Sequence, residues 1–195
     1  MEHAIGPAMG IARRRATYDD LIAVPDHLVA EIIDGELSTS PRPAPPHALA
    51  ATAIGSVLFE RFNGPPGGAA TAPGGWWILD EPELHFGADV LVPDVAGWRR
   101  DRLPALPDIA YFTLAPDWVC EVISPSSGRL DRVKKMPVYA REGVANLWLV
   151  DPIARSLEVY RLEAGRWVVV TPDDTEVRIE PFDDVEIARR RWWVE

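Results

Sequence analysis

Glu121 lies alone inside an apolar run, which makes it the first candidate for a chemical role. The run Trp118–Ile123 is otherwise apolar and has the length of a buried strand. An ionised carboxylate in such a strand is costly unless it is paired, hydrogen-bonded or bound to a metal ion. Glu121 is therefore either the partner of a buried cation or part of a reactive site.

Asp94 and Lys135 supply the other groups that phosphodiester hydrolysis needs. Asp94 follows a second apolar run, Val90–Pro93, and Lys135 follows Glu121 on an expected helix. One or two carboxylates suffice to hold Mg²⁺, which activates a water molecule and polarises a phosphoryl oxygen. A lysine ammonium holds the phosphate or helps to activate the water. Asp94, Glu121 and Lys135 are the minimum set of side chains that a metal-dependent phosphodiesterase needs.

Each of these residues also has a purely structural interpretation. Asp94 follows a proline and can serve as a turn former, and Glu121 can pair with a buried arginine. Lys135 lies four residues after Asp131, the spacing of an exposed helical ion pair worth about 0.2–0.5 kcal/mol. Lys134 points about 100° away from Lys135 on an ideal helix, so only one lysine can face a site, and spacing does not select it.

Glu31 is a further carboxylate on an apolar strand face. The stretch Leu28–Ser38 predicts a hairpin around the favoured two-residue turn Asp34-Gly35. By the two-residue period of a strand, Glu31 then shares a face with Val29 and Ile33. Glu31 therefore joins the candidates for a site role.

The elements that must position these residues alternate between strands and helices. The expected order is a helix after Thr17, the hairpin over Leu28–Ser38, a helix over His47–Phe62, strands from Trp76 to Val95, a strand over Trp118–Ile123, a helix ending near Gly143, a strand over Asn146–Val150, and a hairpin over Ser156–Val170. Strand, helix and strand across residues 118–150 predict a crossover between parallel strands. A mixed sheet with helices on its faces is the expected outcome.

Local signals add detail to these elements. Pro93 has no N–H to donate, so its strand must end, bulge or lie at an edge there. His47 opens its helix after a proline-rich stretch and is predicted to belong to the cap region. In the helix before Gly143, the predicted apolar stripe includes Val133 and Pro137, and Pro137 should kink the helix.

Composition excludes several classes of protein. The 195 residues fit a single domain, and a net charge of −10 argues against a protein that coats nucleic acid by bulk attraction. Arginine and lysine clusters at 99–102 and 129–135 still allow local phosphate contacts or are simply solvated faces.

One cysteine leaves no intrachain disulfide and fits a reducing, cytoplasmic setting. We see neither a signal peptide nor a membrane span, and expect residues 1–16 to form a flexible N-terminal arm.

Three motifs, in this order along the chain, resemble the Uma-two family. They are LVPDVAGWRRDRLP, EVISPSSGRLDRVKKMPVYAREGV and LWLVDP, and the resemblance extends to AEIIDGEL, to the prolines before His47 and to the closing hairpin. The family is bacterial and belongs to the PD-(D/E)XK nuclease superfamily. The resemblance implies an α/β restriction-endonuclease-like fold over residues 17–195, with a mixed central β-sheet flanked by helices, an N-terminal hairpin and a C-terminal strand hairpin.

The resemblance also assigns roles to residues. Asp94 matches the aspartate of the PD motif and Glu121 the acid of the second motif, with the backbone carbonyl of Val122 as a further metal ligand. The superfamily's usual lysine position is occupied by Ile123 here, and the lysine of the family falls on Lys135 in the following helix.

The leading hypothesis is a Mg²⁺- or Mn²⁺-dependent DNA endonuclease, in which Glu31 assists as an added carboxylate. The alternative is a catalytically inactive nuclease-fold module for binding or regulation, which the acidic net charge and the displaced lysine favour. RNA or small phosphorylated molecules would use the same groups as DNA. Nucleases of this superfamily often form homodimers, and the tryptophan pairs at 76–77 and 192–193 are either interface anchors or core residues.

Overall fold

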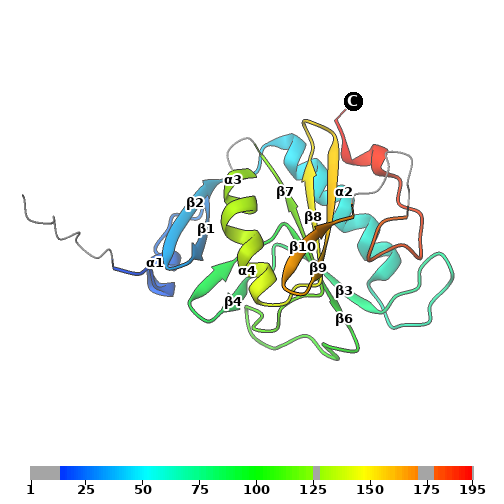
Figure 1. Ribbon diagram of the computed structural model, residues 1–195, viewed down its shortest axis with the longest axis horizontal. Helices are drawn as coiled ribbons and strands as arrows, with labels where there is room; N and C mark the ends of the chain where they lie inside the picture. The colour runs from blue at the N-terminus through cyan, green and yellow to red at the C-terminus, as the bar shows by residue number, and fades with distance from the viewer. Residues whose placement is uncertain (1–13, 125–127, 171–177, 195) are drawn as a thin grey trace, which may run out of the picture.

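Two β-sheets form the framework of the computed structural model, which describes residues 14–124, 128–170 and 178–194 (Figure 1). The smaller sheet has the strand order β2-β1-β5-β4 and the larger one β10-β9-β8-β7-β6-β3. The strands are β1 (Leu28–Ile33), β2 (Glu36–Pro41), β3 (Trp76–Asp80), β4 (Leu84–Phe86), β5 (Asp89–Leu91), β6 (Val95–Arg99), β7 (Trp118–Val122), β8 (Asn146–Asp151), β9 (Ser156–Glu163) and β10 (Arg166–Val169). The helices are α1 (Tyr18–Ile22), α2 (Pro45–Phe62), α3 (Gly128–Leu130), the π-helix η1 (Asp131–Lys135), α4 (Met136–Arg141) and the 3-10 helix η2 (Arg189–Trp192).

The larger sheet is mixed, as predicted. Strands β7 and β8 are parallel, and the continuous helical segment α3-η1-α4 connects them. Its other neighbouring strands are antiparallel, including the C-terminal hairpin β9–β10. The predicted crossover, the mixed sheet and the closing hairpin are therefore confirmed.

The N-terminal hairpin has the register that its turn predicts. Asp34 and Gly35 both have positive φ, 55° and 81°, which is the conformation of a type I′ turn. Ile33 pairs with Glu36, and Glu31 pairs with Ser38. Most of the predicted arm, residues 1–13, lies outside the described residues, while Ala16 donates its N–H to the carbonyl of Gly35.

Alternation along β7 sends its side chains into two separate cores. Trp118, Cys120 and Val122 face α2, and the intervening Val119 lies in the core beneath α4. Because a strand alternates with a period of two, Glu121 shares the α4 side of the sheet with Val119. The strand thus fixes which helix Glu121 meets.

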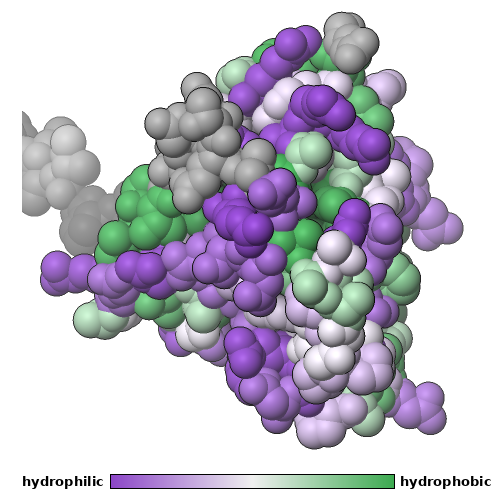
Figure 2. Space-filling view, turned by 90° about the vertical axis from the view of Figure 1, so that its right-hand side faces the viewer, coloured by the Kyte–Doolittle hydropathy of each residue, from purple (hydrophilic) through white to green (hydrophobic). Residues whose placement is uncertain are grey.

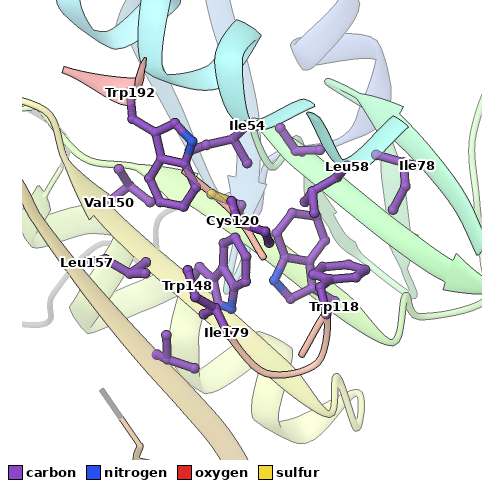
Figure 3. Packing of buried hydrophobic residues seen from close by; sticks show 14 of the residues in the cluster. Ile54, Leu58, Ile78, Trp118, Cys120, Trp148, Val150, Leu157, Ile179 and Trp192 are labelled. Atoms are coloured by element: carbon purple, nitrogen blue, oxygen red, sulfur yellow. The ribbon is translucent and has the colours of Figure 1, made fainter. Parts of the chain in front are cut away.

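The core on the α2 side is rich in tryptophan. Buried residues of α2, among them Ile54 and Leu58, pack against Trp118 and Trp148, and Trp192 closes the cluster from the C-terminal segment (Figure 3). The Trp148 indole N–H also donates to the carbonyl of Glu180. One tryptophan of each predicted pair, Trp76 and Trp192, is buried in this core, so those two rings serve packing within the chain.

The chain passes from one sheet to the other at Pro93. Strand β5 ends at Leu91 in the smaller sheet, and β6 begins at Val95 in the larger one. Pro93 has no N–H to donate to the strand hydrogen bonds of either sheet. The strand break predicted there is confirmed. Asp94 consequently stands at the corner between the two sheets.

The surface is largely hydrophilic on the face that Figure 2 shows, which is the right-hand side of Figure 1. Hydrophobic residues occur there in separate groups between hydrophilic ones (Figure 2). Within the described ranges, no helix has both the length and the apolar character that a bilayer span requires.

Gly97 is a position where the sheet leaves little room for a side chain. A Cβ atom there would lie 3.2 Å from Ile78 Cδ1 and 3.2 Å from a ring carbon of Trp76. We expect Gly97→Ala to lower the free energy of unfolding by about 1–3 kcal/mol through overpacking, measured by urea denaturation. Gly55→Ala is the matched control, because a Cβ in that part of α2 meets only Val95 at 3.9 Å and removal of a helical glycine stabilises by about 0.5–1 kcal/mol. Equal losses in both variants would contradict the packing argument.

Candidate active site

A cavity of about 390 Å³ lies at the corner where the chain changes sheets. Its walls come from the N-terminal hairpin, the start of α2, the corner around Pro93, the end of β7 and the helix η1. Eight ionisable side chains line it: Glu31, Arg42, His47, Glu81, Asp94, Glu121, Asp131 and Lys135, of which Arg42 and Glu81 are exposed. The four candidates chosen from sequence, Glu31, Asp94, Glu121 and Lys135, are therefore brought together, and Val122 lines the same cavity.

Lys135 lies at the centre of this group. Its ammonium Nζ is 2.7 Å from Glu121 Oε1, 3.0 Å from Glu31 Oε1 and 3.9 Å from Asp131 Oδ1. Its side chain is only 4% exposed. Burial lowers the pKa of Lys135, but the surrounding carboxylates outweigh burial, and the net shift is upward. Lys135 is thus a permanent cation at neutral pH.

Glu121 is the most constrained of the carboxylates. Tyr139 donates its hydroxyl to Glu121 Oε1 at 2.5 Å, and Lys135 approaches the same oxygen. Burial raises the pKa of Glu121 well above its usual range, and Asp131, Asp94 and Glu31 add to the rise against the opposing charge of Lys135. Burial and the neighbouring carboxylates therefore disfavour the ionised form of Glu121, and the charge of Lys135 favours it.

Backbone amides at the corner and at the end of β7 orient the other two carboxylates. Glu31 Oε1 accepts the N–H of Val92 at 2.8 Å, and Asp94 Oδ2 accepts the N–H of Val122 at 2.7 Å. Strand β5 stops at Leu91, so a side chain satisfies the amide of Val92 in place of a ladder partner. These bonds fix one oxygen of each carboxylate and direct the groups toward the cavity.

A π-helical turn determines which lysine faces the cavity. Met136 donates its N–H to the carbonyl of Asp131, five residues back, and Pro137 has no N–H with which to continue the α-helical pattern. The kink predicted at Pro137 takes the form of this wider turn. Lys135 points inward, and Lys134 points out to a surface pair with Glu36 at 2.5 Å.

The predicted apolar stripe of this helix is wrong at two positions. Val133 is 60% exposed and Pro137 is also exposed. The buried face carries Asp131, Lys135 and Tyr139, spaced by four residues. The helix presents this polar face to the carboxylates of the sheet, so hydrophobicity alone does not identify its inner side.

Three residues of the cavity or its border were missed from sequence. Asp131 was taken as a surface ion-pair partner but is buried, and Tyr139 was given no role. His47 lies in the first turn of α2, as predicted, but its Nε2 is 3.3 Å from Asp94 Oδ1. The signal that could have found Asp131 and Tyr139 is their spacing of four residues on either side of Lys135.

His47 has an unusual environment. Its Nδ1 is buried without a hydrogen-bond partner among the described residues. Burial lowers the pKa of His47, but Asp94, with smaller contributions from Asp131 and the backbone of Val122, outweighs it, and the net shift is upward. The imidazole of His47 therefore lies next to the Asp94 carboxylate and the Val122 backbone, which are two of the predicted metal ligands.

Most of the basic side chains expected to contact phosphate have partners within the chain. The pairs are Arg99 with Asp101, Arg102 with Asp117, Arg132 with Glu158, and Lys134 with Glu36, while Arg100 stacks over Trp77. The side chain of Arg129 lies outside the described residues. A phosphate contact from these clusters would have to replace an existing interaction.

The donor set of the cavity fits a divalent cation. The four carboxylates that are not exposed, together with Lys135, give a formal charge of −3 when His47 is neutral, while the exposed Glu81 and Arg42 offset each other. A buried excess of negative charge of this kind favours a bound cation. Asp94 and Glu121 offer the oxygen donors that Mg²⁺ and Mn²⁺ prefer. The described residues contain no group of three or more His, Cys, Asp or Glu side chains already arranged to hold a metal ion, so binding would require side chains to move.

The fold is a mixed sheet flanked by helices, and acids and a lysine gather at the corner between the sheets. The structure is similar to the crystal structure of a putative nuclease belonging to DUF820 from Anabaena variabilis, with a TM-score of 0.70 and 22% sequence identity. The similarity covers 91% of this chain and 97% of that one, and it confirms the fold.

The chain belongs to the Uma2 family. Residues 15–189 match this family, which is described as "Putative restriction endonuclease", and the resemblance seen in the sequence motifs is confirmed. None of the curated proteins compared with the chain matches it.

Proposed function

We propose that this protein is a divalent-metal-dependent endonuclease that hydrolyses phosphodiester bonds in DNA. Asp94, Glu121 and the backbone carbonyl of Val122 would hold the metal ion, and Glu31 and Lys135 would complete the site. The observation that carries the proposal is the excess of buried carboxylates over cations in one cavity of a nuclease-family chain.

The residues of the chain have separate tasks in this mechanism. The metal ion, when bound, supplies Lewis acidity and lowers the pKa of a water molecule. The surrounding carboxylates raise the pKa of Lys135, so its ammonium would donate hydrogen bonds to the phosphate or the attacking water. Glu31 and Glu121 fix the position of this ammonium, and the amide of Val122 fixes Asp94.

Asp94→Asn is expected to weaken Mn²⁺ binding at least about tenfold, because even outer-shell partners of metal ligands contribute 10–100-fold to affinity. The measurement is calorimetric titration of Mn²⁺, with plasmid cleavage measured on the same samples. Asp108→Asn, an exposed aspartate outside the cavity, is the control. Unchanged Mn²⁺ affinity in a folded Asp94→Asn protein would remove Asp94 from the site.

A non-catalytic binding or regulatory module is the second candidate. The observation that favours it is the direct pairing of Lys135 with Glu121 and Glu31, which satisfies part of the carboxylate charge without a metal ion. This candidate requires that the carboxylates contribute to stability alone. RNA or small phosphorylated substrates would use the same groups as DNA, and cleavage assays on each would separate them.

A further inference from the structure

We infer that His47 is an additional protein ligand of the metal ion and that it gives the site a preference for nitrogen-accepting first-row transition ions over Mg²⁺. The inference rests on the proposed function, which it deepens by naming the class of ion. Neither the family resemblance nor the sequence pattern assigns a role of this kind to His47.

The distance between His47 and Asp94 fits two ligands of one ion. Nε2 of His47 and Oδ1 of Asp94 are 3.3 Å apart. Adjacent ligands of an octahedral ion with bonds of about 2.1 Å lie about 3 Å from each other. These two atoms are therefore close to the spacing of neighbouring ligands, and the other ligands would move to complete the site.

Both side chains have limited freedom to adopt another arrangement. His47 is 12% exposed and Asp94 16% exposed, and both line the cavity that contains Glu121 and Val122. Pro45 and Pro46 begin α2 directly before His47 and restrict the backbone there. The amide of Val122 holds the second oxygen of Asp94, which leaves Oδ1 facing the imidazole.

The chemistry of the donor determines the preferred ion. Imidazole nitrogen binds Fe²⁺, Co²⁺, Ni²⁺ and Zn²⁺ well, whereas Mg²⁺ prefers sites made of oxygen alone. A site of two carboxylates, a carbonyl and one imidazole therefore discriminates in favour of the transition ions. Without His47 the same site would contain oxygen donors only.

A structural role for His47 makes a different prediction. If the imidazole only donates a hydrogen bond to Asp94, then Gln at position 47 should replace it, because the Gln side-chain amide also donates. The amide is a poor metal ligand for Co²⁺ in comparison with imidazole. His47→Gln therefore separates positioning of Asp94 from coordination.

The experiment is calorimetric titration of the full chain with Co²⁺ and with Mg²⁺, together with the visible absorption spectrum of the Co²⁺ complex. We expect His47→Gln to weaken Co²⁺ binding at least about tenfold and to change its spectrum, while Mg²⁺ affinity changes less than about threefold. His85→Gln is the matched control, since His85 pairs with Glu83 and does not line the cavity.

If wild type and His47→Gln bind Co²⁺ with equal affinity and give the same spectrum, the inference about His47 is overturned. The proposed function then still stands, provided that the protein binds Mg²⁺ and cuts DNA. A wild-type protein that binds neither ion would overturn both. Thermal melting of each variant establishes that the comparison is made between folded proteins.

Discussion

Lys135→Met is expected to lower the free energy of unfolding by about 3–5 kcal/mol, the cost of leaving buried charges without their partner. The ammonium contacts Glu121 and Glu31 within 3.0 Å and also lies near Asp131. Without it, three buried carboxylates repel one another or must take up protons. The measurement is urea denaturation followed by circular dichroism at neutral pH.

Lys134→Met is the matched control for this change. It removes the same charge from the neighbouring position, but the pair of Lys134 with Glu36 is exposed, and such pairs contribute about 0–1 kcal/mol. Losses of similar size in the two variants would contradict the buried-cation account. If Lys135→Met alone does not fold, the double variant with Glu121→Gln should recover part of the stability, because it removes one of the unpaired carboxylates.

Glu121→Gln is expected to reduce DNA cleavage at least about 100-fold, since a metal ion contributes several kcal/mol of transition-state stabilisation and each 1.36 kcal/mol is a factor of ten. The fold should survive, because the amide oxygen of Gln can accept the same hydrogen bonds from Tyr139 and Lys135. Removal of one charge from an acidic cluster should leave the melting temperature unchanged or raise it. Single-turnover cleavage and thermal melting measure the two effects.

The binding-module alternative predicts another pattern for Glu121→Gln. In that case the melting temperature changes while neither protein cuts DNA with any metal ion. A variant that folds and retains wild-type cleavage would remove Glu121 from the catalytic site and leave the fold assignment intact.

Local signals predicted the mixed sheet and the three acids Glu31, Asp94 and Glu121 that the cavity brings together, but not the division of the strands between two sheets. The turn Asp34-Gly35 set the register of the hairpin that carries Glu31, and the apolar run Trp118–Ile123 marked the buried strand that carries Glu121. Pro93 marked the corner at which Asp94 stands. Each of these inferences depends on chain geometry within a few residues, which a sequence displays directly.

The helical side of the site depends on contacts that sequence does not display. A hydrophobic stripe was expected at Val133, but the helix buries Asp131, which lies near the ammonium of Lys135, and Tyr139, which donates its hydroxyl to Glu121 on β7. Lys135 points to the carboxylates and Lys134 points to the surface in a segment with a π-helical turn, which the sequence did not predict.

His47 shows the same limitation for a single residue. A histidine after prolines is typical of a helix start, and α2 does begin there. Its pairing with Asp94 joins residues 47 positions apart in the chain, so only the folded structure brings the pair together.

We propose that the cavity at the sheet corner cuts DNA with a divalent metal ion. The most direct test is incubation of purified protein with supercoiled plasmid in Mg²⁺, in Mn²⁺ and in EDTA, beside Glu121→Gln. We expect nicked or linear product with a metal ion and the wild-type protein, and none in EDTA. Cleavage that persists in EDTA, or that Glu121→Gln retains in full, would contradict the account.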